Sequence, residues 1–111
     1  MPEANSQARL VLTTASSPEE GKRLAKTLVA ERLAACVSLI PGVESIYRWK
    51  SEVETAAETM LVIKTGLEQL AALEARLCEL HSYETPEFLV IDVESGSRPY
   101  LEWLLGSLGQ V

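Results

Sequence analysis

The chain of 111 residues has a mass of 12.2 kDa, and 47% of its residues are hydrophobic and 23% charged. This is the length and composition of one globular domain, residues 1–111, and it is too apolar for a disordered protein. Ten Lys and Arg residues against sixteen Asp and Glu residues give a net charge of −6. Such an acidic balance argues against a broad phosphate-binding face, so we expect no nucleic acid partner and no membrane partner.

The N-terminal residues and the cysteine content predict a cytoplasmic protein. Residues 1–9 contain no apolar segment of the kind found in signal peptides, and we expect residues 1–8 to form a flexible N-terminus. Cys36 and Cys78 are too few for a disulfide framework and lack a CxxC pairing. No apolar stretch approaches the roughly 20 residues that span a bilayer.

The first part of the chain shows a strand signal followed by a helix signal. Residues 9–14 are mostly apolar and rich in β-forming residues, which predicts a strand. Residues 17–20 (SPEE) have the pattern of a capping box, with serine as N-cap, proline at N1 and glutamate at N3. Apolar residues at helical spacing then predict a helix that runs to about Leu33.

The remaining elements complete a recognisable order. Strand signals cover residues 36–49, with a bend at Pro41-Gly42, and return over 53–65 after a turn at 50–52. Leucines at helical spacing predict a second helix from Leu70 to Leu80, and a strand over 87–93 and a short helix over 100–108 follow. The order β-α-β-β-α-β with an extra C-terminal helix predicts an α+β, ferredoxin-like sandwich, with two helices on one face of an antiparallel four-stranded sheet.

The central hairpin is too long for this domain. Each arm holds roughly 14 residues and could reach ~45 Å, whereas helices of ~15 residues reach only ~22 Å. The distal half should overhang the domain and expose strand edges together with the rings of Tyr47 and Trp49. Exposed edges of this length favour pairing with another chain, so we expect a closed homo-oligomer. The alternative is a strongly coiled hairpin that folds back over its own sheet at Pro41-Gly42.

The segment after the second helix carries candidate ligands. Residues 81–87 (HSYETPE) hold the only histidine, a phenol and two carboxylates in a loop, where binding groups are common. His81 and Glu84 could bind a divalent metal ion, with Tyr83 lining the pocket. The alternative is that His81 compensates the negative end of the helix dipole.

Other polar residues are less specific signals. Lys64 ends an apolar strand, where it could form a structural salt bridge with Glu84 or Glu87, or anchor an anionic ligand. Cys78 and His81 have the spacing of half a soft-metal site, with a buried structural cysteine as the alternative. The sequence has no nucleophile–base pattern and no phosphate-binding glycine loop, so we expect no enzymatic activity.

Five segments carry a resemblance to a known family. They are residues 33–37 (LAACV), 40–49 (IPGVESIYRW), 63–65 (IKT), 81–87 (HSYETPE) and 100–104 (YLEWL). In order and spacing they resemble the signature of the CutA family, the divalent-cation-tolerance proteins, and the match runs from Arg9 to about Leu108.

The resemblance implies a ferredoxin-like subunit in a compact trimer whose long hairpins pair between subunits. It also implies a link to the response to metal ions, copper binding in family members, and a trimer similar in shape to PII signalling proteins. By position, His81 matches the histidine of the family's His-Pro-Tyr-Glu motif, with Ser82 in place of the proline. Leu80 stands where some members have a second histidine, and Thr13-Thr14 where some have a cysteine, so two copper ligands are missing.

We therefore expect a homotrimeric divalent-cation-tolerance protein that binds copper(II) or another divalent cation weakly at clefts between subunits, with no cofactor required for folding. The expected metal ligands are His81 and Glu84, and the expected cleft residues are Trp49, Lys64, Tyr83, Glu84 and Glu87. Two alternatives belong to other classes. They are a PII-like small-molecule sensor, in which Lys64 holds an anion, and a trimeric scaffold that anchors partner proteins.

Overall fold

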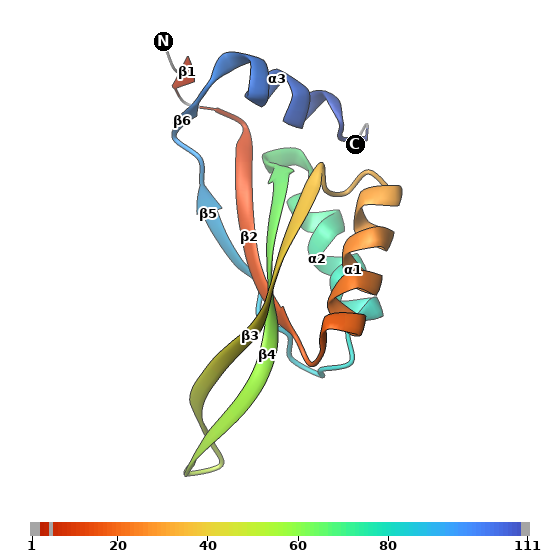
Figure 1. The fold of residues 1–111 in the computed structure, drawn as a ribbon. Helices are drawn as coiled ribbons and strands as arrows, with labels where there is room; N and C mark the ends of the chain where they lie inside the picture. The colour runs from red at the N-terminus through yellow and green to blue at the C-terminus, as the bar shows by residue number, and fades with distance from the viewer. Residues whose placement is uncertain (1–2, 5, 110–111) are drawn as a thin grey trace.

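A computed structural model of the chain describes residues 3–4 and 6–109 and shows an α+β fold (Figure 1). The predicted order β-α-β-β-α-β with a C-terminal helix is confirmed, and two short strands are added to it. None of the helices in these residues is long and apolar enough to cross a membrane. The elements are β1 (Glu3–Ala4), β2 (Ala8–Ala15), α1 (Pro18–Ala30), β3 (Cys36–Trp49), β4 (Glu52–Gly66), the 3-10 helix η1 (Leu67–Gln69), α2 (Leu70–Leu80), β5 (Leu89–Asp92), β6 (Ser95–Gly96) and α3 (Arg98–Gly106).

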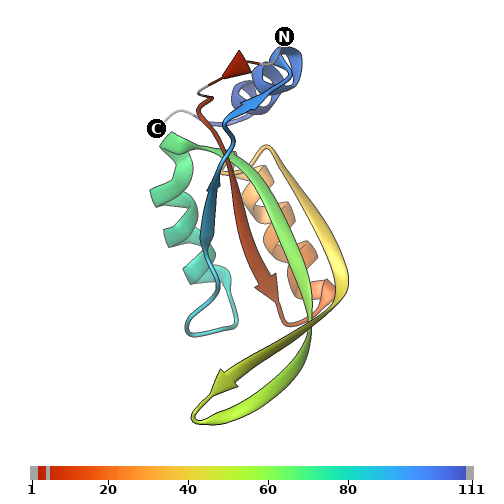
Figure 2. The same ribbon diagram turned by 90° about the vertical axis from the view of Figure 1, so that its left-hand side faces the viewer.

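A four-stranded antiparallel sheet, in the order β3-β4-β2-β5, forms the centre of the molecule. Helices α1 and α2 lie side by side on one face of it, and α3 lies across the end opposite the hairpin tip (Figures 1 and 2). The core between the sheet and the two helices is aliphatic and consists of Val11, Ala15, Leu24, Leu28, Ala34, Leu61, Ile63, Leu73 and Leu77. A smaller cluster packs α3 against the sheet end and contains Ala8, Ala35, Leu101, Leu104 and Leu108.

Helix α1 is shorter than predicted. It ends at Ala30 instead of near Leu33, because Arg32 adopts the left-handed conformation with a φ of 61°. The amide of Leu33 then donates to the carbonyl of Leu28 at 3.0 Å, which is the bond of a Schellman motif. This motif usually contains glycine, so the arginine concealed the helix end in the sequence.

The β3–β4 hairpin extends well beyond the rest of the sheet. Strand β2 pairs with β4 only as far as Ala15 opposite Thr59, and from there the two arms pair only with each other, out to Trp49 opposite Glu52. Residues 50–51 form the turn and have φ values of 49° and 71°. The molecule measures 47 × 27 × 22 Å, and the hairpin makes its long dimension (Figure 1). The predicted overhang is confirmed.

A bulge in β3 decides which way the hairpin side chains point. Ile40 lies opposite Met60, but Val43 lies opposite Glu58, so two residues of β3 face one residue of β4. Gly42 has a φ of 73°, as bulges of this kind require. Because side chains alternate along a strand, Ile40 and Val43 would lie on opposite faces of a regular strand; the bulge places both on the face of Met60 and Glu58.

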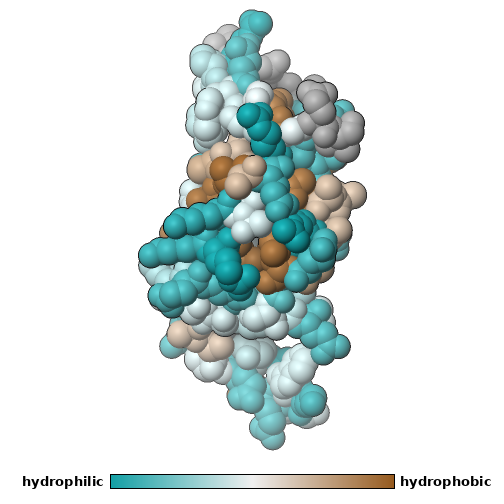
Figure 3. Space-filling model, turned by 90° about the vertical axis from the view of Figure 1, so that its right-hand side faces the viewer, coloured by the Kyte–Doolittle hydropathy of each residue, from teal (hydrophilic) through white to brown (hydrophobic). Residues whose placement is uncertain are grey.

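The sheet face away from α1 and α2 is apolar. Within the described residues no helix packs on its centre, and its β5 side chains Leu89 and Ile91 are 56% and 44% exposed. The helix side is mostly hydrophilic, with smaller apolar patches between charged side chains (Figure 3). By strand register the apolar face carries Leu10, Leu12, Ile40, Met60, Val62, Leu89 and Ile91. We refer to it as the open sheet face.

The N-terminus differs from the flexible segment expected for residues 1–8. Glu3–Ala4 pair with Ser95–Gly96, and Ala8 begins β2 fully buried. The Ser6 hydroxyl donates to the carbonyl of Val93, which holds Ser6 beside the end of β5. Strand pairing therefore orders residues 3–4 and 6–8, and residues 1, 2 and 5 lie outside the described residues.

Candidate functional site

An open groove of about 620 Å³ lies between the distal hairpin and the loop that joins α2 to β5. Figure 2 shows the hairpin bending beneath this loop. The lining is aromatic and acidic and consists of Thr14, Tyr47, Trp49, Glu58, Tyr83, Glu84, Thr85, Pro86 and Glu87. We call it the acidic groove. Four of the five residues expected in a cleft lie here in a single subunit, namely Trp49, Tyr83, Glu84 and Glu87.

The hairpin supplies one wall of the acidic groove. Tyr47 lies opposite Glu54 and Trp49 opposite Glu52, and residues that are directly opposite share a face. The bulge places this face on the side of Glu58. Two exposed aromatic rings therefore stand beside a row of carboxylates along the hairpin.

A short hydrogen bond joins the two walls of the groove. The Tyr83 hydroxyl donates to Oε2 of Glu58 at 2.6 Å. Partial burial alone would raise the pKa of Glu58, but hydrogen bonds from Tyr83, Ser45 and Thr14 together outweigh burial, and the pKa is lowered. Burial and the neighbouring Glu58 carboxylate both raise the pKa of Tyr83. The phenol therefore stays protonated beside an ionised carboxylate, and the pair is charge-assisted.

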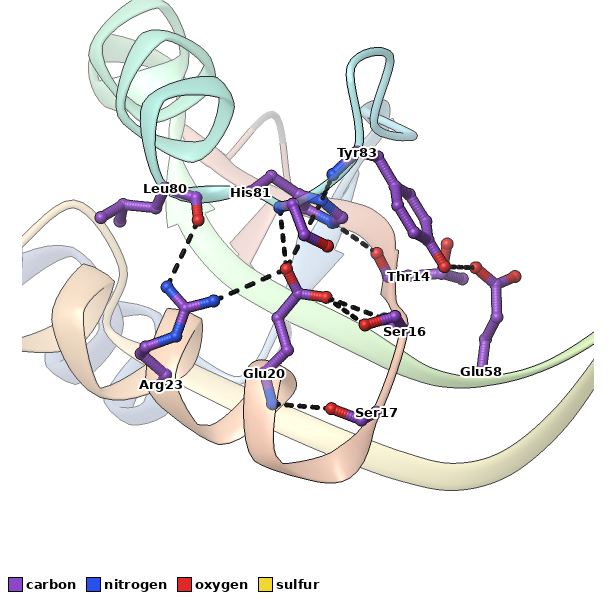
Figure 4. Close-up of polar contacts among 10 residues, drawn as sticks. Thr14, Ser16, Ser17, Glu20, Arg23, Glu58, Leu80, His81 and Tyr83 are labelled. Atoms are coloured by element: carbon purple, nitrogen blue, oxygen red, sulfur yellow. Dashed lines mark hydrogen bonds and ion pairs between the residues drawn. The ribbon is translucent and has the colours of Figure 1, made fainter.

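Behind the groove, the Glu20 carboxylate connects α1 to the 81–87 loop (Figure 4). Its Oε1 accepts from the Ser16 amide at 2.9 Å and the Ser16 hydroxyl at 2.8 Å, and its Oε2 accepts from the Ser82 amide at 2.8 Å. The Ser17 hydroxyl accepts from the Glu20 amide at 3.1 Å, as the predicted capping box requires. The glutamate, however, reaches back to Ser16 instead of the N-cap residue.

These bonds keep the buried Glu20 ionised. Its side chain is only 6% exposed, and burial alone would raise its pKa. The hydrogen bonds from Ser16 and Ser82 outweigh burial and lower the pKa of Glu20 to about 2. Arg23 adds a guanidinium nitrogen 3.6 Å from Oε2. The carboxylate is thus a fixed anchor for the loop that forms the second wall of the groove.

His81 is a structural residue of this loop. Its side chain is fully buried, with Nε2 2.7 Å from the carbonyl oxygen of Thr14 and Nδ1 3.0 Å from the amide nitrogen of Tyr83. A carbonyl only accepts, so Nε2 carries the proton and donates, and Nδ1 accepts from Tyr83. Both ring nitrogens are used. Within one subunit His81 therefore has no free nitrogen to offer a metal ion, and its ring positions Tyr83.

The donor set in one subunit does not fit a tightly bound copper ion. Among residues 3–4 and 6–109, no group of three or more His, Cys, Asp or Glu side chains is arranged to hold a metal ion. Cys78 is exposed on α2 while His81 is buried, so the two do not form a half-site. Copper favours imidazole and sulfur ligands, whereas Glu84 offers only carboxylate oxygens to the groove.

Lys64 does not line the acidic groove of its own subunit, so its place in a cleft between subunits stays a prediction. It sits near the end of β4 opposite Cys36, far along the strand from the hairpin tip. Its Nζ is 4.0 Å from Sγ of Cys36 and 5.8 Å from the centroid of the Tyr100 ring. Within the described residues Lys64 forms no ion pair, so the predicted salt bridge to Glu84 or Glu87 is not observed either.

Three residues of the site were missed from the sequence. Tyr47 of β3 shares the face of Glu58 on β4 only because the bulge shifts the register of β3, and a bulge has no clear signature beyond its glycine. Glu58 is one of several glutamates on the hairpin, so its residue type alone does not single it out. Glu20 was placed in the capping box, but its second partner, Ser82, lies 62 residues further along the chain. Local patterns carry no information on such a contact.

Known proteins that are similar to this chain carry the name CutA. The family described as CutA1 divalent ion tolerance protein matches residues 9–107. The divalent-cation tolerance protein CutA of Thermus thermophilus is 43% identical over 100 residues, which are 90% of this chain and 97% of that protein. Protein CutA 1, chloroplastic, of Oryza sativa is 43% identical over 98 residues, which are 88% of this chain and 55% of that protein.

Solved structures agree with the sequence comparison. The structure of CutA from Synechococcus elongatus is 38% identical with a TM-score of 0.94, covering 98% of this chain and 96% of that one. CutA1 from Oryza sativa is 40% identical with a TM-score of 0.93, covering 96% of this chain and 97% of that one. The family match covers most of the sequence and the likeness extends to the whole fold. The chain belongs to the CutA1 divalent ion tolerance family.

Proposed function

We propose that this chain is a homotrimeric divalent-cation-tolerance protein whose acidic groove, completed between subunits, binds divalent cations weakly. The observation that carries the proposal is the composition of the groove: Glu58, Glu84 and Glu87 line it, and no Lys or Arg does. Carboxylates are hard oxygen ligands, and two or three of them hold a cation loosely when no geometry is preset.

The open sheet face and the overhanging hairpin support the assembly. Exposed aliphatic side chains on a sheet are unfavourable in water and are covered in most oligomers. The distal hairpin arms leave their outer edges unpaired within the described chain. A closed trimer would cover both features with one symmetric contact.

Copper(II) titration followed by calorimetry tests the cation site. We expect weak binding by the wild type and a further loss of roughly three- to tenfold when Glu84→Gln and Glu87→Gln are combined. The matched control is Glu68→Gln with Glu74→Gln, which removes two exposed carboxylates outside the groove and should leave the affinity unchanged. Equal affinities for wild type and the groove variant would contradict the proposal.

Two other functions have some support. A small-molecule sensor is supported by the size of the groove, because about 620 Å³ is within the range of ligand pockets. In such a sensor the anion expected at Lys64 would bind outside the acidic groove. Thermal-shift screening of wild type and Lys64→Ala against nucleotides would test this, because only the wild type should be stabilised. A scaffold for partner proteins is supported by the exposed hairpin, and pull-downs with a hairpin-trimmed variant would test it.

The proposal includes a cytoplasmic location and no catalytic activity. Free cysteines at Cys36 and Cys78 suit a reducing compartment. Glu20 accepts a hydrogen bond from the amide of Ser82, and His81 bonds to the backbone of Thr14 and Tyr83. These contacts suit a structural role better than proton transfer. Fractionation of cells tests the location, since one similar structure is described as periplasmic and two relatives as chloroplastic.

A further inference from the structure

The acidic groove combines carboxylates with aromatic rings, and metal binding alone needs only the carboxylates. Its charged lining residues are all glutamates, and Glu84 and Glu87 form no ion pair or hydrogen bond within the described residues. Beside them stand Tyr47 and Trp49, whose residues are 45% and 59% exposed. An isolated metal ion gains little from aromatic faces, whereas a cation with an apolar body gains from both.

The chain itself shows that one of these rings accepts an ammonium group. Nζ of Lys50 lies 5.8 Å from the centroid of the Trp49 ring, within the range of a cation–π contact. Lys50 is the first residue of the hairpin turn and is not part of the groove lining. The Lys50 ammonium thus shows the kind of contact that a cationic ligand could make with the Trp49 ring.

We propose that the acidic groove binds an organic cation, an ammonium group on an apolar body, with the body against Trp49 and Tyr47 and the charge toward Glu84 and Glu87. This inference rests on the proposed role of the groove as a binding site and names its ligand class. Anions are disfavoured because no positive side chain lines the groove. Glu58 also lines the groove, but its carboxylate already accepts hydrogen bonds from Tyr83, Ser45 and Thr14, so the proposal assigns the charge to Glu84 and Glu87.

Three probes of nearly the same shape separate charge from apolar contact. Phenethylammonium carries a positive charge, 2-phenylethanol is neutral and phenylacetate is negative. We expect phenethylammonium to bind the full-length protein at least tenfold more tightly than 2-phenylethanol, and phenylacetate not to bind. Binding is followed by the NMR shift of the Trp49 indole N–H. Equal binding of the charged and neutral probes, or binding of none, would overturn the proposal.

Substitutions locate the site. Trp49→Ala should weaken phenethylammonium binding about tenfold, and Trp49→Phe should restore part of it because a ring remains. For the Trp49 variants binding is measured by calorimetry, since the indole signal is lost. Ile46→Ala is the matched control, because Ile46 is 67% exposed on the other face of the same arm. A loss shared by Ile46→Ala would show that the effect belongs to the hairpin and would overturn the assignment to the ring.

The same variants separate this inference from the divalent-cation proposal. Trp49→Ala removes no oxygen ligand, so it should leave copper(II) binding unchanged while weakening phenethylammonium binding. The combined Glu84→Gln and Glu87→Gln variant should weaken both. Copper binding without phenethylammonium binding would overturn the inference alone, and phenethylammonium binding without copper binding would overturn only the metal proposal.

Discussion

At the scale of single residues, Glu20 connects parts of the chain that are distant in sequence. One carboxylate oxygen caps the approach to α1 through Ser16, and the other holds the amide of Ser82. Because three donors converge on a buried group, the ionised form is strongly favoured over the protonated one. The stability that Glu20 contributes therefore depends on pH.

Replacing Glu20 with glutamine should destabilise the protein at neutral pH by about 2–3 kcal/mol. The pKa of Glu20 lies below its ordinary value of 4.5, at about 2, so its contribution is complete above about pH 5 and declines as the pH falls toward 2. The gap between wild type and Glu20→Gln should narrow over that interval. Urea unfolding at one protein concentration measures it, with the exposed Glu19→Gln as control. A gap that is constant with pH would contradict this account.

Removing the Tyr83 hydroxyl should alter the charge state of the groove. Tyr83→Phe leaves Glu58 without its closest donor, so the pKa of Glu58 should rise toward its usual range and stability should fall by about 1 kcal/mol. An NMR titration of the Glu58 carboxyl carbon follows the first effect. The control is Tyr100→Phe, because Tyr100 is a half-exposed tyrosine on α3. An unchanged titration of Glu58 in Tyr83→Phe would contradict the role assigned to the hydrogen bond.

The site was only partly predictable at this scale. Residue types identified the 81–87 loop and Trp49 as candidates, because a histidine, carboxylates and rings on loops are visible in any sequence. The roles could not be assigned, since they depend on which carbonyl or amide lies beside each side chain. His81 illustrates this: both of its nitrogens are bonded to the backbone, at Thr14 and Tyr83.

At the scale of elements, the order of strands and helices was predictable because each has its own hydrophobic period and boundary residues. The boundaries of these elements were less predictable where the turns contain residues that are unusual in turns. The helix end at Arg32 and the turn at Lys50 and Ser51 all use positive φ values without glycine. A left-handed backbone conformation is unfavourable for residues other than glycine, so suitable substitutions in these turns should raise the stability of the protein.

The hairpin turn offers a direct test of this conformational cost. The combined change Lys50→Asn and Ser51→Gly supplies the residues that type I′ turns prefer and should stabilise the hairpin tip by about 1 kcal/mol. Hydrogen exchange of the backbone amides beside the turn should slow about fivefold. Lys50→Gln alone changes the charge but not the turn preference, so it should not slow the exchange. Faster exchange in the double variant would contradict the assigned turn.

At the scale of the whole molecule, assembly is the main expectation. Light scattering should give a particle of about three times 12.2 kDa. Leu89→Lys places a charge on the open sheet face, where burial of an unpaired ammonium is costly, and should weaken the assembly at least tenfold. Ala72→Lys adds the same charge to the exposed surface of α2 and should leave the mass unchanged. A wild-type particle of 12.2 kDa at working concentration would contradict the trimer.

The bulge between Ile40 and Val43 has a consequence for how the hairpin can vary in length among related sequences. Deleting one residue there would leave a single residue opposite Thr59, so the distal arm of β3 would keep its partners on β4. Adding one residue to each arm beyond the bulge would instead exchange inner and outer side chains toward the tip. Adding two residues to each arm would only move the tip outward. Beyond the bulge, length differences in this hairpin should therefore come in even steps per arm, and a one-residue difference confined to β3 should fall at the bulge.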